Sequence, residues 1–271
     1  MGGVPELAEV EAYRRLAEEV VGRAVAEVVA PDGWYLKRGL TAPVVAAALA
    51  GRRVMAARRI GKLLLVETDG PVLGLRFGMS GRLLVDGRAA VDNLLYAPGD
   101  VPGTQAGREL EKWDRFALRF ASPAGGDLRM RDPRRLGGVE LDPPEARLGP
   151  DALVVTPAAL ARLLESGAPL KARLMDQSRL AGVGNLAADE VLWRAGLDPS
   201  RPARSLTAAE RCRLHRHLRA TMADLLARGG SHTGDLMPHR QPGGTCPKDG
   251  TPLVRRTVGG RTTWSCPHHQ R

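Results

Sequence analysis

The sequence predicts an α+β protein in which one helix precedes a β-rich segment, a helical segment follows, and a short basic hairpin ends the chain. Three observations support this prediction. Short apolar or alternating segments, separated by Gly, Pro and Asp turns, fill most of residues 22–142. Apolar residues in the stretches after residue 145 recur every three or four positions. The residues after 230 lack such a period and need a hairpin or a metal ion to hold them.

The first predicted element is a helix from Pro5 to Val21. Pro5 suits the first helical position, Glu6 is favourable in the first turn, and Gly22 can end the helix. The apolar residues that would form its buried face are Leu7, Val10, Tyr13, Leu16 and Val20.

The β-rich part is expected to form two packed sheets, because its segments are short and bounded by turn signals such as Asp-Gly and Gly-Pro. Five strands are predicted from this pattern: Lys62 to Thr68, Val72 to Phe77, Arg82 to Val85, Phe116 to Ala121 and Leu128 to Met130.

The helical part contains a predicted helix from Thr207 to Arg228, which opens with a Thr207/Glu210 capping box. Before it, two helices over 170–176 and 186–195 are joined by a Gly-rich turn that ends at Asn185. We expect Asn185 to cap the second helix. The amides of such a helix start can hold a DNA phosphate, with Asn185 and Lys171 as further donors. An ordinary helical hairpin is the alternative interpretation.

Composition favours a polyanionic partner. The 271 residues are 43% hydrophobic and carry a formal charge of +10, and residues 201–271 hold thirteen Arg and Lys against four acids. An Arg-rich solvated surface is the alternative explanation of the charge. We expect an intracellular protein, because no segment has the length of a membrane span or the pattern of a signal peptide. The three cysteines, at positions 212, 246 and 266, point to metal or packing roles rather than disulfides.

One segment carries a specific resemblance. The sequence from Met175 to Pro199, MDQSRLAGVGNLAADEVLWRAGLDP, resembles the helix-two-turn-helix signature of the formamidopyrimidine-DNA glycosylase and endonuclease VIII family. Further stretches fit that family in the same order and extend the resemblance over essentially the whole chain: PELAEVE at 5–11, GKLLL at 61–65, GMSG at 78–81, DPRRLG at 132–137, LGP at 148–150 and the segment 246–270.

The resemblance implies three domains, with boundaries that we place at 1–142, 143–240 and 241–271. These are a catalytic β-sandwich with a leading helix, a helix-two-turn-helix DNA-binding domain and a zinc-finger-like hairpin. It also implies that a monomer binds double-stranded DNA with a damaged base or an abasic site, in a cleft between the halves. The expected location is the bacterial cytoplasm, associated with the nucleoid, and the expected activity is that of a bifunctional glycosylase and abasic-site lyase.

The resemblance also implies the catalytic residues. A base must leave the stack before its sugar can be attacked, and the family uses an N-terminal proline for that attack. Pro5 is then the nucleophile, Glu6 the acid and Lys62 a cation near the lesion phosphate. Without the resemblance, Pro5 and Glu6 are typical residues of a helix start.

Four residues, MGGV, precede Pro5 in this sequence, so its nitrogen is an amide in the 271-residue form. We expect Val4 to be the initiation residue, read as methionine and then removed. The alternative is a relative that has lost catalysis and still binds DNA.

By resemblance, three residues fill the space that an extruded base leaves: Met79, Arg134 and Leu136. The family commonly has Phe at the position of Leu136. A leucine can still wedge between bases but stacks less, so the sequence does not define the lesion or the opposite base. Packing in the protein interior is the alternative for Leu136.

The last segment has two C-x-x-ligand pairs around a Gly259-Gly260 hairpin signal. Where the family has four cysteines, this chain has Cys246, Asp249, Cys266 and His269, a set that can bind one structural Zn²⁺. A metal-free hairpin packed on Leu253 and Trp264 is the alternative, and His239 and His268 are substitute ligands.

On this hairpin, Arg261 is expected by resemblance to clamp phosphates that flank the lesion. The segment 229–246 ahead of it is shorter than is typical of the family. A DNA-lesion-binding protein without catalysis and an RNA-binding protein are the competing functional interpretations.

Overall fold

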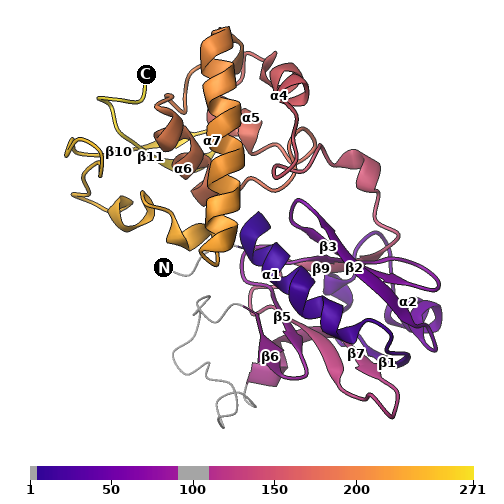
Figure 1. The fold of residues 1–271 in the computed structure, drawn as a ribbon. Helices are drawn as coiled ribbons and strands as arrows, with labels where there is room; N and C mark the ends of the chain where they lie inside the picture. The colour runs from indigo at the N-terminus through magenta and orange to yellow at the C-terminus, as the bar shows by residue number, and fades with distance from the viewer. Residues whose placement is uncertain (1–4, 91–109) are drawn as a thin grey trace. The chain divides into compact units, whose positions relative to one another are not determined.

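The computed structural model describes residues 5–90 and 110–271 (Figure 1). The described chain divides into two compact units. The first holds Pro5 and the described residues of Glu9–Pro144, and the second holds Glu6–Ala8 and Glu145–Arg271. No helix among the described residues is both long enough and apolar enough to cross a membrane.

The leading helix is shorter than predicted. Helix α1 (Leu7–Ala17) begins two residues after Pro5 and continues as the 3-10 helix η1 (Glu18–Val20). Its predicted apolar face is buried: Leu7 belongs to the core of the second unit, whereas Tyr13 and the other predicted positions belong to the core of the first. Pro5 and Glu6 lie outside the helix, and the Glu6 carboxylate accepts hydrogen bonds from the distant segment 184–187.

The first unit contains two antiparallel sheets, as the sequence predicts. One has the strand order β1 (Val25–Val29), β7 (Asp114–Phe120), β8 (Asp127–Arg131), β5 (Arg82–Val85) and β6 (Arg88–Ala89). The other has the order β2 (Val54–Ile60), β3 (Leu63–Thr68), β4 (Leu73–Arg76) and β9 (Gly138–Leu141). Their apolar side chains share one core, the arrangement of a β-sandwich.

All five predicted strands are present, with ends within two residues of the prediction. Helix α2 (Ala42–Leu49) and two 3-10 helices, η2 (Gly33–Tyr35) and η3 (Leu110–Trp113), lie between strands. The sequence analysis did not identify these short elements because none spans enough turns to show a period.

The second unit is helical (Figure 1). Its helices are α4 (Pro157–Leu164), α5 (Leu170–Leu174), α6 (Asn185–Ala195) and α7 (Ala208–Ala227). The capping box predicted at Thr207 and Glu210 is present at the start of α7. The unit also contains 3-10 helices: η4 (Glu145–Arg147) precedes α4, η5 (Ala203–Ser205) lies between α6 and α7, and η6 (Ser231–Thr233) and η7 (Met237–His239) follow α7.

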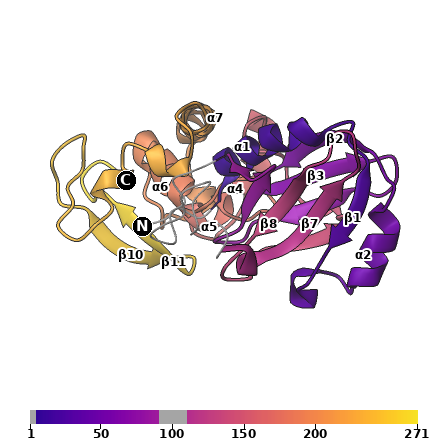
Figure 2. The same ribbon diagram turned by 90° about the horizontal axis from the view of Figure 1, so that it is seen from below.

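The predicted hairpin closes this unit (Figure 2). Strands β10 (Val254–Val258) and β11 (Arg261–Ser265) pair antiparallel and are joined by Gly259 and Gly260. Both glycines have positive φ, 56° and 74°, as a type I′ turn requires. The predicted α+β fold is therefore confirmed in its three parts: the sandwich, the helices and the hairpin.

Candidate functional site

Glu6 lies in the interior of the second unit. Its carboxylate is 1% exposed and accepts hydrogen bonds from the backbone N–H groups of Gly184 (3.1 Å), Leu186 (2.8 Å) and Ala187 (3.1 Å). These donors form the N-terminus of α6, where unpaired amides and the helix dipole favour a negative charge. Glu6 therefore binds the helix start that the sequence analysis assigned to a DNA phosphate.

The predicted role of Asn185 as the helix cap is wrong. Gly184 is the N-cap residue, and Asn185 is the first residue of α6. The cap comes from a carboxylate far away in the sequence, and spacing within the segment could not reveal it. The side-chain oxygen of Asn185 is buried and has no hydrogen-bond partner.

The turn before α6 is held by the side chain of Gln177. Its Nε2 donates to the carbonyls of Met175 and Val183, both at 2.9 Å, and its Oε1 accepts from the N–H of Gly182 at 2.9 Å. One amide side chain thus satisfies three backbone groups and fixes the turn that positions the Glu6 contacts.

The predicted role of Lys171 as a phosphate donor is also wrong. Its side chain is 0% exposed, with Nζ 2.6 Å from Oδ1 of Asp189. The same ammonium donates to the carbonyl of Thr262 (3.1 Å) and the hydroxyl of Thr263 (2.8 Å). Burial lowers the pKa of Lys171, and Asp189 opposes that shift. A cation enclosed in this way supports the hairpin and is closed to solvent.

Asp189 is the centre of this buried network. It is 0% exposed, pairs with Arg240 at 2.8 Å and accepts from the backbone N–H of Trp264 at 3.2 Å. Next to these contacts, the carbonyl of Arg261 accepts from the Thr263 hydroxyl at 3.0 Å. The network therefore fixes the backbone of β11 and leaves Arg261 exposed at its start.

The segment ahead of the hairpin is attached to α6 through Glu190. This carboxylate is 3% exposed and accepts from the backbone N–H groups of Asp235 (3.1 Å) and Leu236 (2.9 Å). Arg194 pairs with the same carboxylate at 2.7 Å. The short segment is thus anchored by one buried charge on the helix.

In the first unit, a loop over residues 132–137, which we call the wedge loop, is built on Asp132. This carboxylate is 0% exposed and accepts from the Ser80 hydroxyl (2.5 Å) and from the backbone N–H groups of Arg134 (3.2 Å) and Gly137 (2.7 Å). Arg134 is exposed, and Leu136 is 49% exposed. The exposure of Leu136 argues against a role in interior packing.

The wedge loop contacts the turn that carries Met79. A Cβ placed on Gly78 would lie 2.4 Å from the backbone carbonyl group of Leu136, so the two backbones touch. Met79 follows in that turn and is 37% exposed. The structure therefore brings together the segments of all three residues that were predicted to fill the space of an extruded base.

The other two predicted catalytic residues also belong to the first unit. Pro5 is buried and directly precedes Glu6. Lys62 is half-buried in the turn between β2 and β3.

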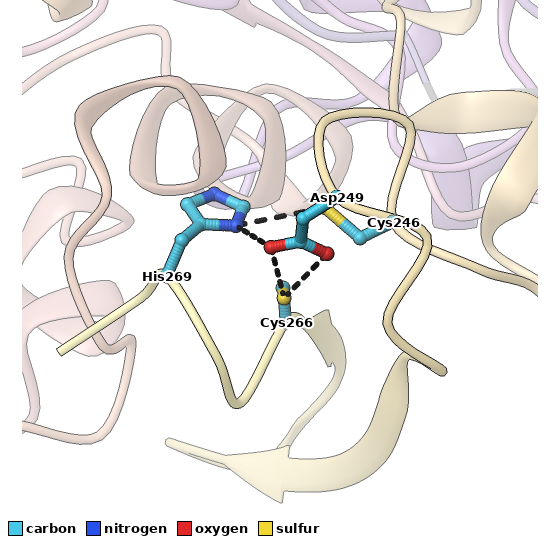
Figure 3. Close-up of side chains that lie close together, drawn as sticks. All are labelled: Cys246, Asp249, Cys266 and His269. Atoms are coloured by element: carbon cyan, nitrogen blue, oxygen red, sulfur yellow. Dashed lines mark hydrogen bonds and ion pairs between the residues drawn. The ribbon is translucent and has the colours of Figure 1, made fainter.

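The four predicted metal ligands converge (Figure 3). One ligand atom from each of Cys246, Asp249, Cys266 and His269 lies within 4.8 Å of the others. The distances from Cys246 Sγ to His269 Nδ1, Cys266 Sγ to Asp249 Oδ2 and His269 Nδ1 to Asp249 Oδ2 are 3.5, 3.4 and 3.2 Å. Tetrahedral zinc with bonds of about 2.0–2.3 Å separates its ligands by about 3.3–3.8 Å. The donor set could hold a metal ion, and the three distances lie close to the separations in a tetrahedral site.

Groups around the cluster orient these ligands. The Trp193 carbonyl lies 3.1 Å from His269 Nε2 and can accept a hydrogen bond from an Nε2–H group. In that tautomer, the Nδ1 lone pair is left for a metal. The Trp193 indole N–H donates to Cys246 Sγ at 3.3 Å. The backbone N–H of Thr251 lowers the pKa of Asp249, which favours the charged form that a metal needs. His268 lies beside Asp249 at 3.2 Å, and His239 is outside the cluster.

Several buried residues that support the wedge loop and the second unit were not predicted from the sequence. Asp132, Gln177, Asp189 and Trp193 all lie within motifs that it singled out, but their roles depend on partners elsewhere in the fold. For Asp189, an acid inside a largely apolar helical pattern was an available signal.

Comparisons with known proteins agree with this geometry. The model of the formamidopyrimidine-DNA glycosylase N-terminal domain matches residues 4–139, and that of the H2TH domain of the same proteins matches residues 148–236. The formamidopyrimidine-DNA glycosylase of Thermus thermophilus is 36% identical over 294 residues, with 97% of each chain covered. That of Geobacillus kaustophilus is 33% identical over 294 residues, covering 99% of this chain and all of the relative.

Solved structures give the same result. A complex between the Lactococcus lactis Fpg and DNA containing an abasic site superposes with a TM-score of 0.79 at 25% identity, covering 98% of this chain and 100% of the other. A complex of that protein with THF-DNA and an inhibitor gives the same values. On these matches over nearly its full length, the chain belongs to the formamidopyrimidine-DNA glycosylase family.

Proposed function

We propose that this protein is a base-excision repair DNA glycosylase that removes a damaged base and then cleaves the abasic site through a Pro5 iminium. The observation that carries the proposal is the position of Glu6: an acid directly after Pro5 is buried on the start of α6, within the matched H2TH domain. The relatives named as formamidopyrimidine-DNA glycosylases and the solved complexes with lesion-containing DNA support it.

The chemistry follows from a secondary amine. The Pro5 nitrogen attacks C1′ of the flipped nucleotide as the bond from C1′ to the base breaks, and the base leaves with that electron pair and takes up a proton. Opening of the sugar ring gives an iminium between C1′ and the Pro5 nitrogen. Its positive charge makes the C2′ proton acidic, and loss of that proton expels the 3′ phosphate, which is β-elimination.

Glu6 handles protons at the reacting sugar. Three backbone N–H donors hold its carboxylate in one orientation, so it does not need to reorganise during the reaction. Lys62 supplies a fixed cation for the lesion phosphate, since phosphate charge opposes the departure of a second anion.

The attack requires that Pro5 is the first residue, because an amide nitrogen has no available lone pair. We propose that the active form begins at Pro5, after Val4 has served as the initiation residue. The four residues before Pro5 in the sequence favour a second candidate: a protein that binds lesions without catalysis. Absence of catalysis in the form that begins at Pro5 would favour the second candidate.

The remaining predicted residues bind duplex DNA. Met79, Arg134 and Leu136 fill the space of the extruded base, and Asn185 and Arg261 contact phosphates. Under this proposal, catalysis belongs to residues 1–142. The helix-two-turn-helix contacts to DNA belong to residues 143–240, and the hairpin that clamps the phosphates belongs to residues 241–271. We propose that the protein acts as a monomer on the chromosome in the bacterial cytoplasm.

We also propose that the ligand cluster holds one structural Zn²⁺. The ion would join two segments, one around Cys246 and Asp249 and the other around Cys266 and His269, at the base of the hairpin. Its contribution is rigidity of the hairpin that presents Arg261, and it takes no part in the reaction at the sugar.

Base release from a duplex with one ring-opened or oxidised purine tests the function. The form that begins at Pro5 should release the base and nick the strand, and Glu6→Gln should lower the single-turnover rate at least a hundredfold. Glu27→Gln, which changes an exposed carboxylate on β1, is the matched control and should keep the rate. A Glu6→Gln variant as fast as the control would remove Glu6 from the mechanism.

A further inference from the structure

An exposed tryptophan lies in the first unit, near the wedge loop. Trp34 is 70% exposed, the largest value among the exposed large hydrophobic residues in the described part of the chain. Tryptophan buries a large area when it packs and is enriched at contact surfaces, so the surroundings of this ring are a candidate binding site. The function proposed above does not use it.

An ion pair connects Trp34 to the wedge loop. Asp32 caps the short η2 helix by accepting from the Trp34 backbone N–H at 3.1 Å. Arg135 donates to both oxygens of that Asp32 carboxylate, at 2.6 Å each, and sits between Arg134 and Leu136 in the sequence. Arg135 has φ 56°, a left-handed conformation that a residue with a side chain keeps only when its contacts hold it.

A cavity of about 590 Å³ opens beside the indole. Its charges balance, because three acidic and three basic side chains line it: Asp32, Glu111, Asp114, Lys112, Arg115 and Arg135. A balanced lining suits a neutral ring with polar edges better than a phosphate, whose charge would require an excess of cations.

Lys37 covers one face of the Trp34 indole ring. Its Nζ donates to the Trp34 carbonyl at 2.8 Å and lies 5.3 Å from the centroid of the indole ring. The hydrogen bond and the cation–π contact hold the tryptophan in place. An incoming ring can stack on the side of the indole that the cation does not cover.

We propose that Trp34 and this cavity hold an unstacked base of the bound DNA, within a few nucleotides of the lesion. The inference rests on the proposed function, which brings a distorted duplex against the wedge loop. Aromatic side chains stack on bases of any sequence, so the site would stabilise a distorted strand rather than read a base. The ion pair between Asp32 and Arg135 makes the stacking platform and the wedge parts of one rigid element.

The test uses duplexes with a stable tetrahydrofuran abasic-site analogue and one 2-aminopurine, placed in turn at each position within three nucleotides of the analogue on both strands. Fluorescence and affinity are measured for the wild type, Trp34→Phe, Trp34→Leu and the control Met55→Ala, which changes a side chain 54% exposed in the same unit. Thermal unfolding of each variant establishes that its fold is intact.

At one position, the wild type and Trp34→Phe should quench the 2-aminopurine, whereas Trp34→Leu should leave it bright and lower the affinity about tenfold. Met55→Ala should behave as the wild type. Equal spectra and affinities for Trp34→Leu and the wild type at every position would overturn the inference while lesion binding stands. A leucine variant that loses only self-association would assign the ring to a protein contact and overturn it too. A wild type that does not prefer the abasic analogue over intact duplex would overturn the proposed function itself.

Discussion

The wedge loop and the hairpin each present an exposed arginine, but different kinds of buried contact support them. Each presents an exposed cation, Arg134 or Arg261, and each is supported by a carboxylate that is 0% exposed, Asp132 or Asp189. In the wedge loop, Asp132 accepts from neutral donors, among them two backbone N–H groups of the loop itself. In the hairpin, Asp189 pairs with two buried or nearly buried cations from other elements, Lys171 and Arg240.

This difference predicts how the stability of each element responds when a partner of its buried carboxylate is lost. Loss of a neutral hydrogen bond leaves one polar group unsatisfied, whereas loss of one partner of a buried ion pair leaves a charge without compensation. The hairpin should therefore be the more fragile of the two elements.

Asp189→Asn should have the largest effect. It leaves Lys171 and Arg240 buried without a counter-charge, which costs about 3–5 kcal/mol of unfolding free energy. Asp132→Asn keeps a similar shape and should cost about 1–3 kcal/mol, since one acceptor is lost. Denaturant unfolding of the two variants measures this difference. Equal losses would contradict the distinction between the two elements.

Trp193→Phe tests the second anchor of the hairpin. The variant keeps the ring and the carbonyl that faces His269 but removes the N–H bond to Cys246. We expect zinc affinity to fall about tenfold, as is typical when a group that supports a ligand is lost. Competition with a chromophoric chelator measures the affinity, and Trp113→Phe in the first unit is the control. Unchanged affinity in Trp193→Phe would show that the indole does not support the metal site.

The exposed Arg261 of the hairpin and the buried Lys171 of α5 should affect the salt dependence of DNA affinity differently. Arg261→Gln should reduce the slope of log affinity against log salt by about 1, because it removes one phosphate contact. Lys171→Met should lower stability and leave that slope unchanged in the folded protein, because Lys171 is enclosed. A slope change in Lys171→Met equal to that in Arg261→Gln would restore the sequence-based assignment of Lys171 to DNA.

The smallest effect is expected from a half-buried ion pair at the start of α7, between Arg201 and Glu210. Hydrogen bonds from Arg201 and Thr207 lower the pKa of Glu210 to about 2 from 4.5. Because the folded pKa is depressed, the stabilisation is complete above about pH 4.5 and is lost as the pH falls towards 2. Glu210→Gln should cost about 1 kcal/mol at pH 7 and progressively less as the pH falls through 2, as measured by thermal unfolding. A cost independent of pH would exclude the ionised carboxylate as its source.

Several elements that depend on local pattern were predicted from the sequence. Alternation and turn residues located the strands, and the capping box located α7. The metal ligands were also predictable, because two C-x-x-ligand pairs across a Gly-Gly turn are local signals. Spacing could suggest these elements because their contacts lie close along the chain.

Burial of charge could not be predicted in the same way. Lys171 looks like a surface cation in the sequence, and only the fold places Asp189 beside it. Asn185 has the residue type of a cap, but Glu6 provides the contacts from a distant segment. In both cases a tertiary partner overrides a correct local preference.

Trapping of the covalent intermediate tests the central claim most directly. The form that begins at Pro5 and the 271-residue form are each incubated with a duplex carrying one abasic site, and borohydride is added before intact mass is measured. We predict an adduct at Pro5 in the shorter form only, since only its nitrogen is a free amine. If neither form is trapped while both bind the duplex, the Pro5 iminium and the lyase activity are contradicted.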